Sequence, residues 1–236
     1  MTRRNVCIIG IDEASRRQRG RASSHPHKYI IGIDEAGRGP LAGPVVVAGV
    51  YVSRAMQADF LRRGIRDSKK LTAKKREEWF RFLTAHPKIR WSVTSVWPRV
   101  IDRINIAQAA NLGARRVYAK LCSDLRLVQE QFVQLDGGLV LPPPILHEVI
   151  IKGDEKIPAI AAASIIAKVT RDRIMLRLHK KYPQYRFDLH KGYGTELHRE
   201  MIRLHGPSRT HRQSFRMGTH LPNQFVFSRV QVWHHQ

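Results

Sequence analysis

The chain has 236 residues, and its 42 Lys and Arg against 19 Asp and Glu give a formal net charge of +23 at pH 7. A hydrophobic share of 42% provides for the core of one large domain and excludes a disordered tail. Cys7 and Cys122 have no paired spacing, which argues against a disulfide framework or structural zinc. No apolar run reaches the roughly 20 residues of a membrane span. We expect a cytoplasmic monomer with no membrane partner, whose charge points first to nucleic acid.

Residues 8–14 recur identically as residues 30–36, and both copies read IIGIDEA. The first copy leads into a basic stretch that contains serine, whereas the second leads into a Gly-rich turn and an apolar run. Only the second copy is therefore predicted to form a strand that leads through a turn into a second strand. We therefore predict a mobile basic extension over 1–27 and a globular domain from residue 28 onward.

The predicted elements alternate between strands and helices along the domain. In chain order, they are strands at 29–33 and 45–52, a helix capped by Thr72, a half-exposed strand at 89–96, a helix over 102–121, short apolar runs at 132–135 and 149–151, and a helix over 158–180. Trp79, Phe80 and Leu83 form the apolar stripe of the first helix. From Tyr182 onward the pattern is helical and partly irregular. The fold class is therefore α/β, with a mixed sheet flanked by helices and a helical C-terminal portion.

Carboxylates stand at the ends of three predicted strands, in a chain that is poor in acids. Asp34 and Glu35 end the first strand, Asp136 ends another, and Asp154 follows the run that ends at Ile151. Strand ends are where ligands bind in open α/β sheets. If these ends converge, the carboxylates repel one another unless cations neutralise them, and hard oxygen ligands select Mg²⁺ or Mn²⁺. Two such ions promote hydrolysis of a phosphodiester. The alternative for a single Asp beside Gly is a turn former.

Several motifs, in one order along the chain, resemble ribonuclease HII. They are residues 32–46 (GIDEAGRGPLAGPVV), 67–71 (DSKKL), 101–106 (IDRINI), 136–137 (DG), 152–154 (KGD), 160–172, 182–183 (YP), 190–195 (HKGYGT) and 211–215 (HRQSF). The resemblance spans about residues 29–215, and it implies a catalytic domain over 28–215 followed by an atypical tail over 216–236. It favours ribonuclease HII over ribonuclease HIII because Arg38 stands where the sister family carries Lys.

The resemblance implies a ribonuclease H-like fold and an endonuclease that cuts the RNA strand of RNA–DNA hybrids. It also implies nicking of duplex DNA 5′ to an embedded ribonucleotide, with Mg²⁺ or Mn²⁺ in a two-metal site and with 3′-hydroxyl and 5′-phosphate products. By motif position, the catalytic and metal-binding residues are Asp34, Glu35, Asp136 and Asp154. Gly37, Arg38 and Gly39 would contact the ribose 2′-hydroxyl, and Tyr193 would stack on the next sugar.

Further substrate contacts are expected from basic and polar side chains, each with a simpler alternative. Phosphate contacts are assigned to Lys69, Lys70 and Lys168, which could equally form a solvated face. Ser164 shares a helix face with Lys168 and would touch the nucleic-acid backbone, or only pack. We expect Asp172 to pair with a neighbouring Arg, and we place His190, His198 and His211 on the surface rather than in catalysis.

Two other functions remain open at this point. A basic nucleic-acid-binding protein without catalysis would explain the charge but not the carboxylates at the strand ends. Another carboxylate nuclease, such as ribonuclease HIII or a junction resolvase, would explain the carboxylates but fits the Gly37–Gly39 motif and Tyr193 less well. The sequence does not determine whether a replication clamp is a partner.

Overall fold

The computed structural model describes residues 28–65, 71–125 and 131–215. The first copy of the repeat, the predicted extension, Lys69, Lys70 and the predicted tail all lie outside these ranges. Among the described residues, no helix is both long and apolar enough to cross a membrane.

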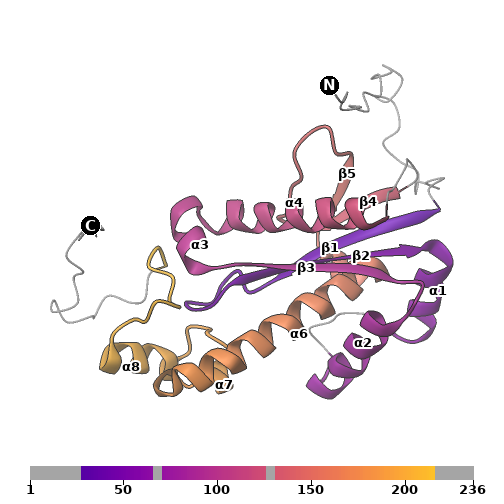
Figure 1. Cartoon of the computed structure of the whole chain (residues 1–236). Coiled ribbons are helices and arrows are strands. Elements are labelled where there is room, and N and C mark those ends of the chain that lie inside the picture. Colours follow the sequence, from indigo (N-terminus) through magenta and orange to yellow (C-terminus); the bar gives the residue numbers. More distant parts are fainter. Residues whose placement is uncertain (1–27, 66–70, 126–130, 216–236) are drawn as a thin grey trace.

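A five-stranded mixed sheet forms the centre of the molecule, in the order β3-β2-β1-β4-β5 (Figure 1). The strands are β1 (Tyr29–Ala36), β2 (Val45–Ser53), β3 (Arg90–Val96), β4 (Gln131–Asp136) and β5 (His147–Ile150). The pairs β1–β2 and β2–β3 are antiparallel, whereas β1–β4 and β4–β5 are parallel. The predicted mixed α/β sheet is thereby confirmed, and each of its five predicted strands is present with ends shifted by a few residues.

Helices cover both faces of this sheet (Figure 1). They are α1 (Arg54–Arg62), α2 (Ala73–Ala85), α3 (Pro98–Ile104), α4 (Ile106–Leu125), α5 (Gly153–Lys156), α6 (Pro158–Lys181), α7 (Phe187–His190) and α8 (Glu196–His205), with a 3₁₀ turn η2 (Pro183–Tyr185). One face packs against α4 and the other against α6, beside which α1 and α2 lie. The C-terminal elements η2, α7 and α8 continue from the far end of α6.

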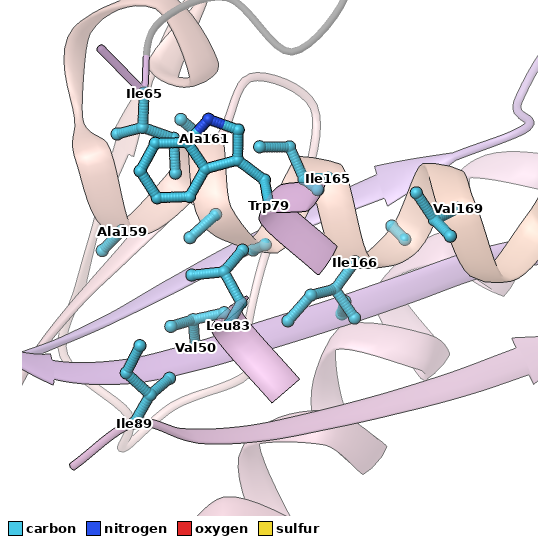
Figure 2. Packing of buried hydrophobic residues seen from close by; sticks show 14 of the residues in the cluster. Val50, Ile65, Trp79, Leu83, Ile89, Ala159, Ala161, Ile165, Ile166 and Val169 are labelled. Carbon is cyan, nitrogen blue, oxygen red and sulfur yellow. The ribbon is translucent and has the colours of Figure 1, made fainter. Parts of the chain in front are cut away.

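The alternation of side chains along β2 divides the core into two layers. Val46 and Val50 belong to the cluster under α6, whereas Val45 and Val47 belong to the cluster under α4. Trp79 and Leu83 of α2 are buried in the α6 layer, as Figure 2 shows, and Phe80 is partly buried against it. This confirms the apolar stripe predicted for α2.

Gly32 lets α6 lie directly on β1. A Cβ atom at Gly32 would stand 2.3 Å from the backbone carbon of Ala159, at the start of α6. The strand therefore tolerates no side chain at this position. Close packing here brings the second turn of α6, including Ser164, to the end of β1.

Two helical regions differ from the sequence-based expectation. The helix predicted over 102–121 is divided into α3 and α4 at Asn105, which has φ +64° and whose side chain accepts a hydrogen bond from Gln108 N–H (3.0 Å). Asn tolerates this left-handed conformation and also caps helices, so one residue ends α3 and begins α4. Helix α1 was not predicted, although Ser53 caps it by accepting from Met56 N–H (3.2 Å).

Candidate active site

The parallel pairing of β1 with β4 brings two of the predicted carboxylates together. Ile33 is in register with Leu135. The next residues of the two neighbouring strands, Asp34 and Asp136, therefore lie side by side. Asp154 follows β5, as expected, and belongs to the short helix α5. The ends of β1 and β4 therefore meet at one edge, which is the convergence that a shared carboxylate site requires.

Asp34 lies in an environment that disfavours its charge. The residue is only 3% exposed, and this burial raises the pKa of its carboxyl group well above the usual value. The negative charges of Glu35 and Asp136 raise this pKa further. Hydrogen bonds from the Ser164 side chain and from Glu35 N–H (2.6 Å) oppose the shift. Ser164 thus contacts a carboxylate of the site, and its contact with the nucleic-acid backbone stays a prediction.

The other carboxylates are oriented by protein donors. Arg38 forms an ion pair with Glu35 (Nε to Oε1, 3.2 Å) and also donates to the carbonyl of Gly138 (2.7 Å). Gly153 N–H donates to Asp136 Oδ1 (2.7 Å), which ties the start of α5 to the end of β4. Asp154 is 1% exposed.

Within the described ranges, no group of three His, Cys, Asp or Glu side chains is arranged to hold a metal ion as it stands. The donor chemistry nevertheless fits a hard divalent cation, because Asp34 and Asp136 supply carboxylate oxygens in a partly buried position. The charges of Glu35 and Asp136, which add to the effect of burial on the pKa of Asp34, would be compensated by such a cation.

The loop that follows β1 rests on two arginines with no exposed surface, Arg171 of α6 and Arg212. Gly37 has φ +92°, and a Cβ atom there would stand 2.0 Å from Arg171 Nε, so both the backbone angle and the space require glycine. Neither arginine was predicted to have a role, although each belongs to a motif that resembles ribonuclease HII. A buried Arg is rare without a partner, and sequence alone does not reveal burial.

Tyr193 lies beside Lys168, the lysine of α6 that is predicted to contact a phosphate. Its ring is 43% exposed, with Lys168 Nζ at 5.9 Å and the Arg171 guanidinium carbon at 5.6 Å from the ring centroid. Lys168 pairs with Asp172 (2.8 Å), which corrects the expectation that Asp172 pairs with an arginine. Tyr193, Lys168 and Ser164 therefore extend along one side of α6 from the carboxylates.

The three histidines expected on the surface are buried in the C-terminal portion. His198 is fully buried and stacks on His190 (centroids 4.2 Å apart), and its Nε2 lies 3.2 Å from His211 Nε2. Burial is the main cause that lowers the pKa of His198 to about 3 and that of His211 to about 4. They stay neutral because Phe187 and Tyr185 pack around them. Their high frequency in the chain had suggested exposure, but aromatic packing decides their position.

Comparisons with known proteins agree with this architecture. The family model described as Ribonuclease HII matches residues 31–218. A ribonuclease HII of Xanthomonas campestris pv. campestris is 46% identical over 191 residues, which cover 80% of this chain and 75% of that protein. The ribonuclease HII of Archaeoglobus fulgidus, solved as a complex with PCNA, is 30% identical with a TM-score of 0.63 and covers 81% of this chain and 96% of that one.

A ribonuclease HIII, Bst-RNase HIII in complex with Mn²⁺, has the same fold. It is 22% identical with a TM-score of 0.67, over 82% of this chain and 69% of that one. Structural similarity alone therefore does not separate the two sister families, whereas sequence identity does. The chain belongs to the ribonuclease HII family and is an endonuclease of the ribonuclease H type.

Proposed function

We propose that this protein cuts the RNA strand of RNA–DNA hybrids and nicks duplex DNA on the 5′ side of an embedded ribonucleotide. The observation that carries the proposal is the placement of Asp34 and Asp136 side by side at the end of β1 and β4, directly before the Gly37–Gly39 loop. A carboxylate cluster suits phosphodiester hydrolysis, and an adjacent glycine backbone suits recognition of a sugar hydroxyl.

The carboxylates Asp34, Glu35, Asp136 and Asp154 would hold two Mg²⁺ or Mn²⁺ ions. When bound, these ions would lower the pKa of the attacking water and neutralise the charge that develops on the leaving oxygen. Ser164 orients Asp34, and Gly153 N–H orients Asp136, so that both carboxylates keep defined directions before substrate arrives.

The chain's own residues would position the substrate. Backbone groups of Gly37 and Gly39 would contact the ribose 2′-hydroxyl, since no side chain hinders approach at either glycine. The exposed ring of Tyr193 would stack on the adjoining deoxyribose and so favour a junction between RNA and DNA. Lys168 is near enough to this ring to contact the intervening phosphate.

A duplex of DNA with one ribonucleotide tests this proposal. In the presence of Mg²⁺, we expect a single nick 5′ to the ribonucleotide, with 3′-hydroxyl and 5′-phosphate ends, and no cut in the all-DNA duplex. Asp34→Asn should abolish the nick, whereas Asp124→Asn, which changes an exposed carboxylate on α4, should leave it intact. No nick by the wild type, or equal nicking by Asp34→Asn, would overturn the proposal.

A further inference from the structure

Arg212 donates hydrogen bonds to three carbonyl groups of one loop. Its Nη2 donates to Gly37 (2.6 Å), its Nη1 to Arg38 (2.7 Å) and its Nε to Gly43 (3.0 Å). The side chain has no exposed surface, and the three acceptors of its hydrogen bonds are backbone carbonyls rather than carboxylates. Burial and the nearby Arg171 charge lower the pKa of Arg212 to about 9, so it is still charged at neutral pH.

We infer that Arg212 is a positioning residue that fixes the Gly37–Gly39 loop in the shape that recognises a ribonucleotide. This inference rests on the proposed function and adds a residue to it. A single guanidinium spans the beginning and the end of the turn between β1 and β2, and it sets the direction of the peptide groups in between.

The direction of two amides follows from the hydrogen bonds that Arg212 makes. In a trans peptide, the C=O and the following N–H point in opposite directions. Because the carbonyls of Gly37 and Arg38 point inward to Arg212, the N–H groups of Arg38 and Gly39 point outward. Neither N–H donates to another residue in the described part of the chain. Both remain available for a hydroxyl or phosphate oxygen of the substrate.

The same loop also controls a carboxylate. The Arg38 carbonyl is held by Arg212, while the Arg38 side chain pairs with Glu35 (3.2 Å) and donates to Gly138 (2.7 Å). A shift of the Arg38 backbone would therefore move the ion pair at Glu35 as well. Loop shape and carboxylate orientation are coupled through one residue.

Arg212 is itself anchored from outside the loop. The Asp102 carboxylate on α3 accepts from Gln213 N–H (3.1 Å), Ser214 N–H (3.0 Å) and the Ser214 hydroxyl (2.7 Å). In addition, Arg212 N–H donates to the Leu41 carbonyl (2.8 Å). The segment after α8 thus fixes the loop to α3, and replacing Asp102 weakens this anchor and removes a negative charge near Arg212 while leaving the Arg212 side chain in place.

The test measures single-turnover nicking of the single-ribonucleotide duplex together with binding of the all-DNA duplex. Arg212→Lys retains the charge but cannot reach three carbonyls with one ammonium group. We expect its cleavage rate to fall at least about tenfold, as expected when reacting groups are misplaced, while duplex affinity stays within about threefold. Asp102→Ala should show the same pattern with a smaller loss, and Arg116→Lys, on the exposed side of α4, should match the wild type.

Folding of each variant is checked by circular dichroism and thermal unfolding before the kinetics are compared. A folded Arg212→Lys with the wild-type cleavage rate, or a loss confined to duplex affinity, would overturn the inference. If Arg212→Lys does not fold, wild-type kinetics of Asp102→Ala would overturn it instead. A wild-type protein that fails to nick at the ribonucleotide would refute the proposed function itself, and the variants are interpreted only when the wild type cuts.

Discussion

Replacement of Gly37 by alanine tests the geometry of the substrate-contacting loop. Gly37 has φ +92°, which costs an alanine about 1–2 kcal/mol. The new Cβ would stand 2.0 Å from Arg171 Nε and displace a side chain that donates to the carbonyls of Pro44 (3.1 Å) and Ala42 (3.2 Å). Since a hydrogen bond to a charged group contributes about 1.5–3 kcal/mol, loss of one of these bonds brings the expected destabilisation to about 2.5–5 kcal/mol.

Urea unfolding of Gly37→Ala and Gly39→Ala measures this difference. A Cβ at Gly39 meets no atom within 4 Å, so Gly39→Ala should keep its free energy of unfolding within about 0.5 kcal/mol of the wild type. Nicking by Gly37→Ala should be lost at temperatures where it is still folded, because the loop must move to admit the methyl group. Equal stabilities of the two variants would refute the reasoning about Arg171 and the loop.

Two further predictions concern the C-terminal portion. Tyr193→Ala should slow nicking of the single-ribonucleotide duplex about tenfold, the size of a stacking contact of roughly 1–3 kcal/mol, with unchanged stability because the ring is largely outside the core. Equal rates would remove the assigned role of Tyr193. His198 and His211 titrate at about 3 and about 4 when folded against 6.5 ordinarily, so the unfolded chain binds more protons below pH 6.5. The contribution of these neutral histidines to the free energy of unfolding is therefore complete above pH 6.5. It is lost as the pH falls toward 4, by at most about 1.4 kcal/mol per pH unit for each histidine. In urea unfolding between pH 7 and 5, His198→Leu should show a shallower dependence on pH than the wild type, and identical slopes would contradict this.

Local patterns predicted the sheet and the position of the carboxylates well. Alternating and continuous apolar runs identified the strands, and the Asp34-Glu35 and Asp136-Gly137 pairs marked the strand ends that meet. Thr72 was correctly predicted as a helix cap, and its hydroxyl accepts from Lys75 N–H (3.2 Å). These features depend on residues that are close in sequence, so the pattern contains the necessary information.

The features that were not predicted depend mostly on contacts between residues far apart in the sequence. Arg212 reaches the Gly37 carbonyl across 175 residues, and the buried histidines contact one another between separate helices and turns. Asn105 ends α3 through a single left-handed residue within an otherwise helical pattern. The histidines were predicted to be exposed because the chain is rich in them, and buried arginines were not predicted because arginine is rarely fully buried. Their burial is possible because backbone carbonyls and aromatic rings surround them.

The central claim is that the carboxylates at the ends of β1 and β4 hold the divalent cations, and Mn²⁺ uptake measures this without relying on cleavage. Free Mn²⁺ is followed by electron paramagnetic resonance during titration with protein bound to an all-DNA duplex. We predict uptake by the wild type and by Asp124→Asn, and loss of that uptake in Asp34→Asn and Asp136→Asn. Equal uptake by the wild type and Asp34→Asn would contradict the account.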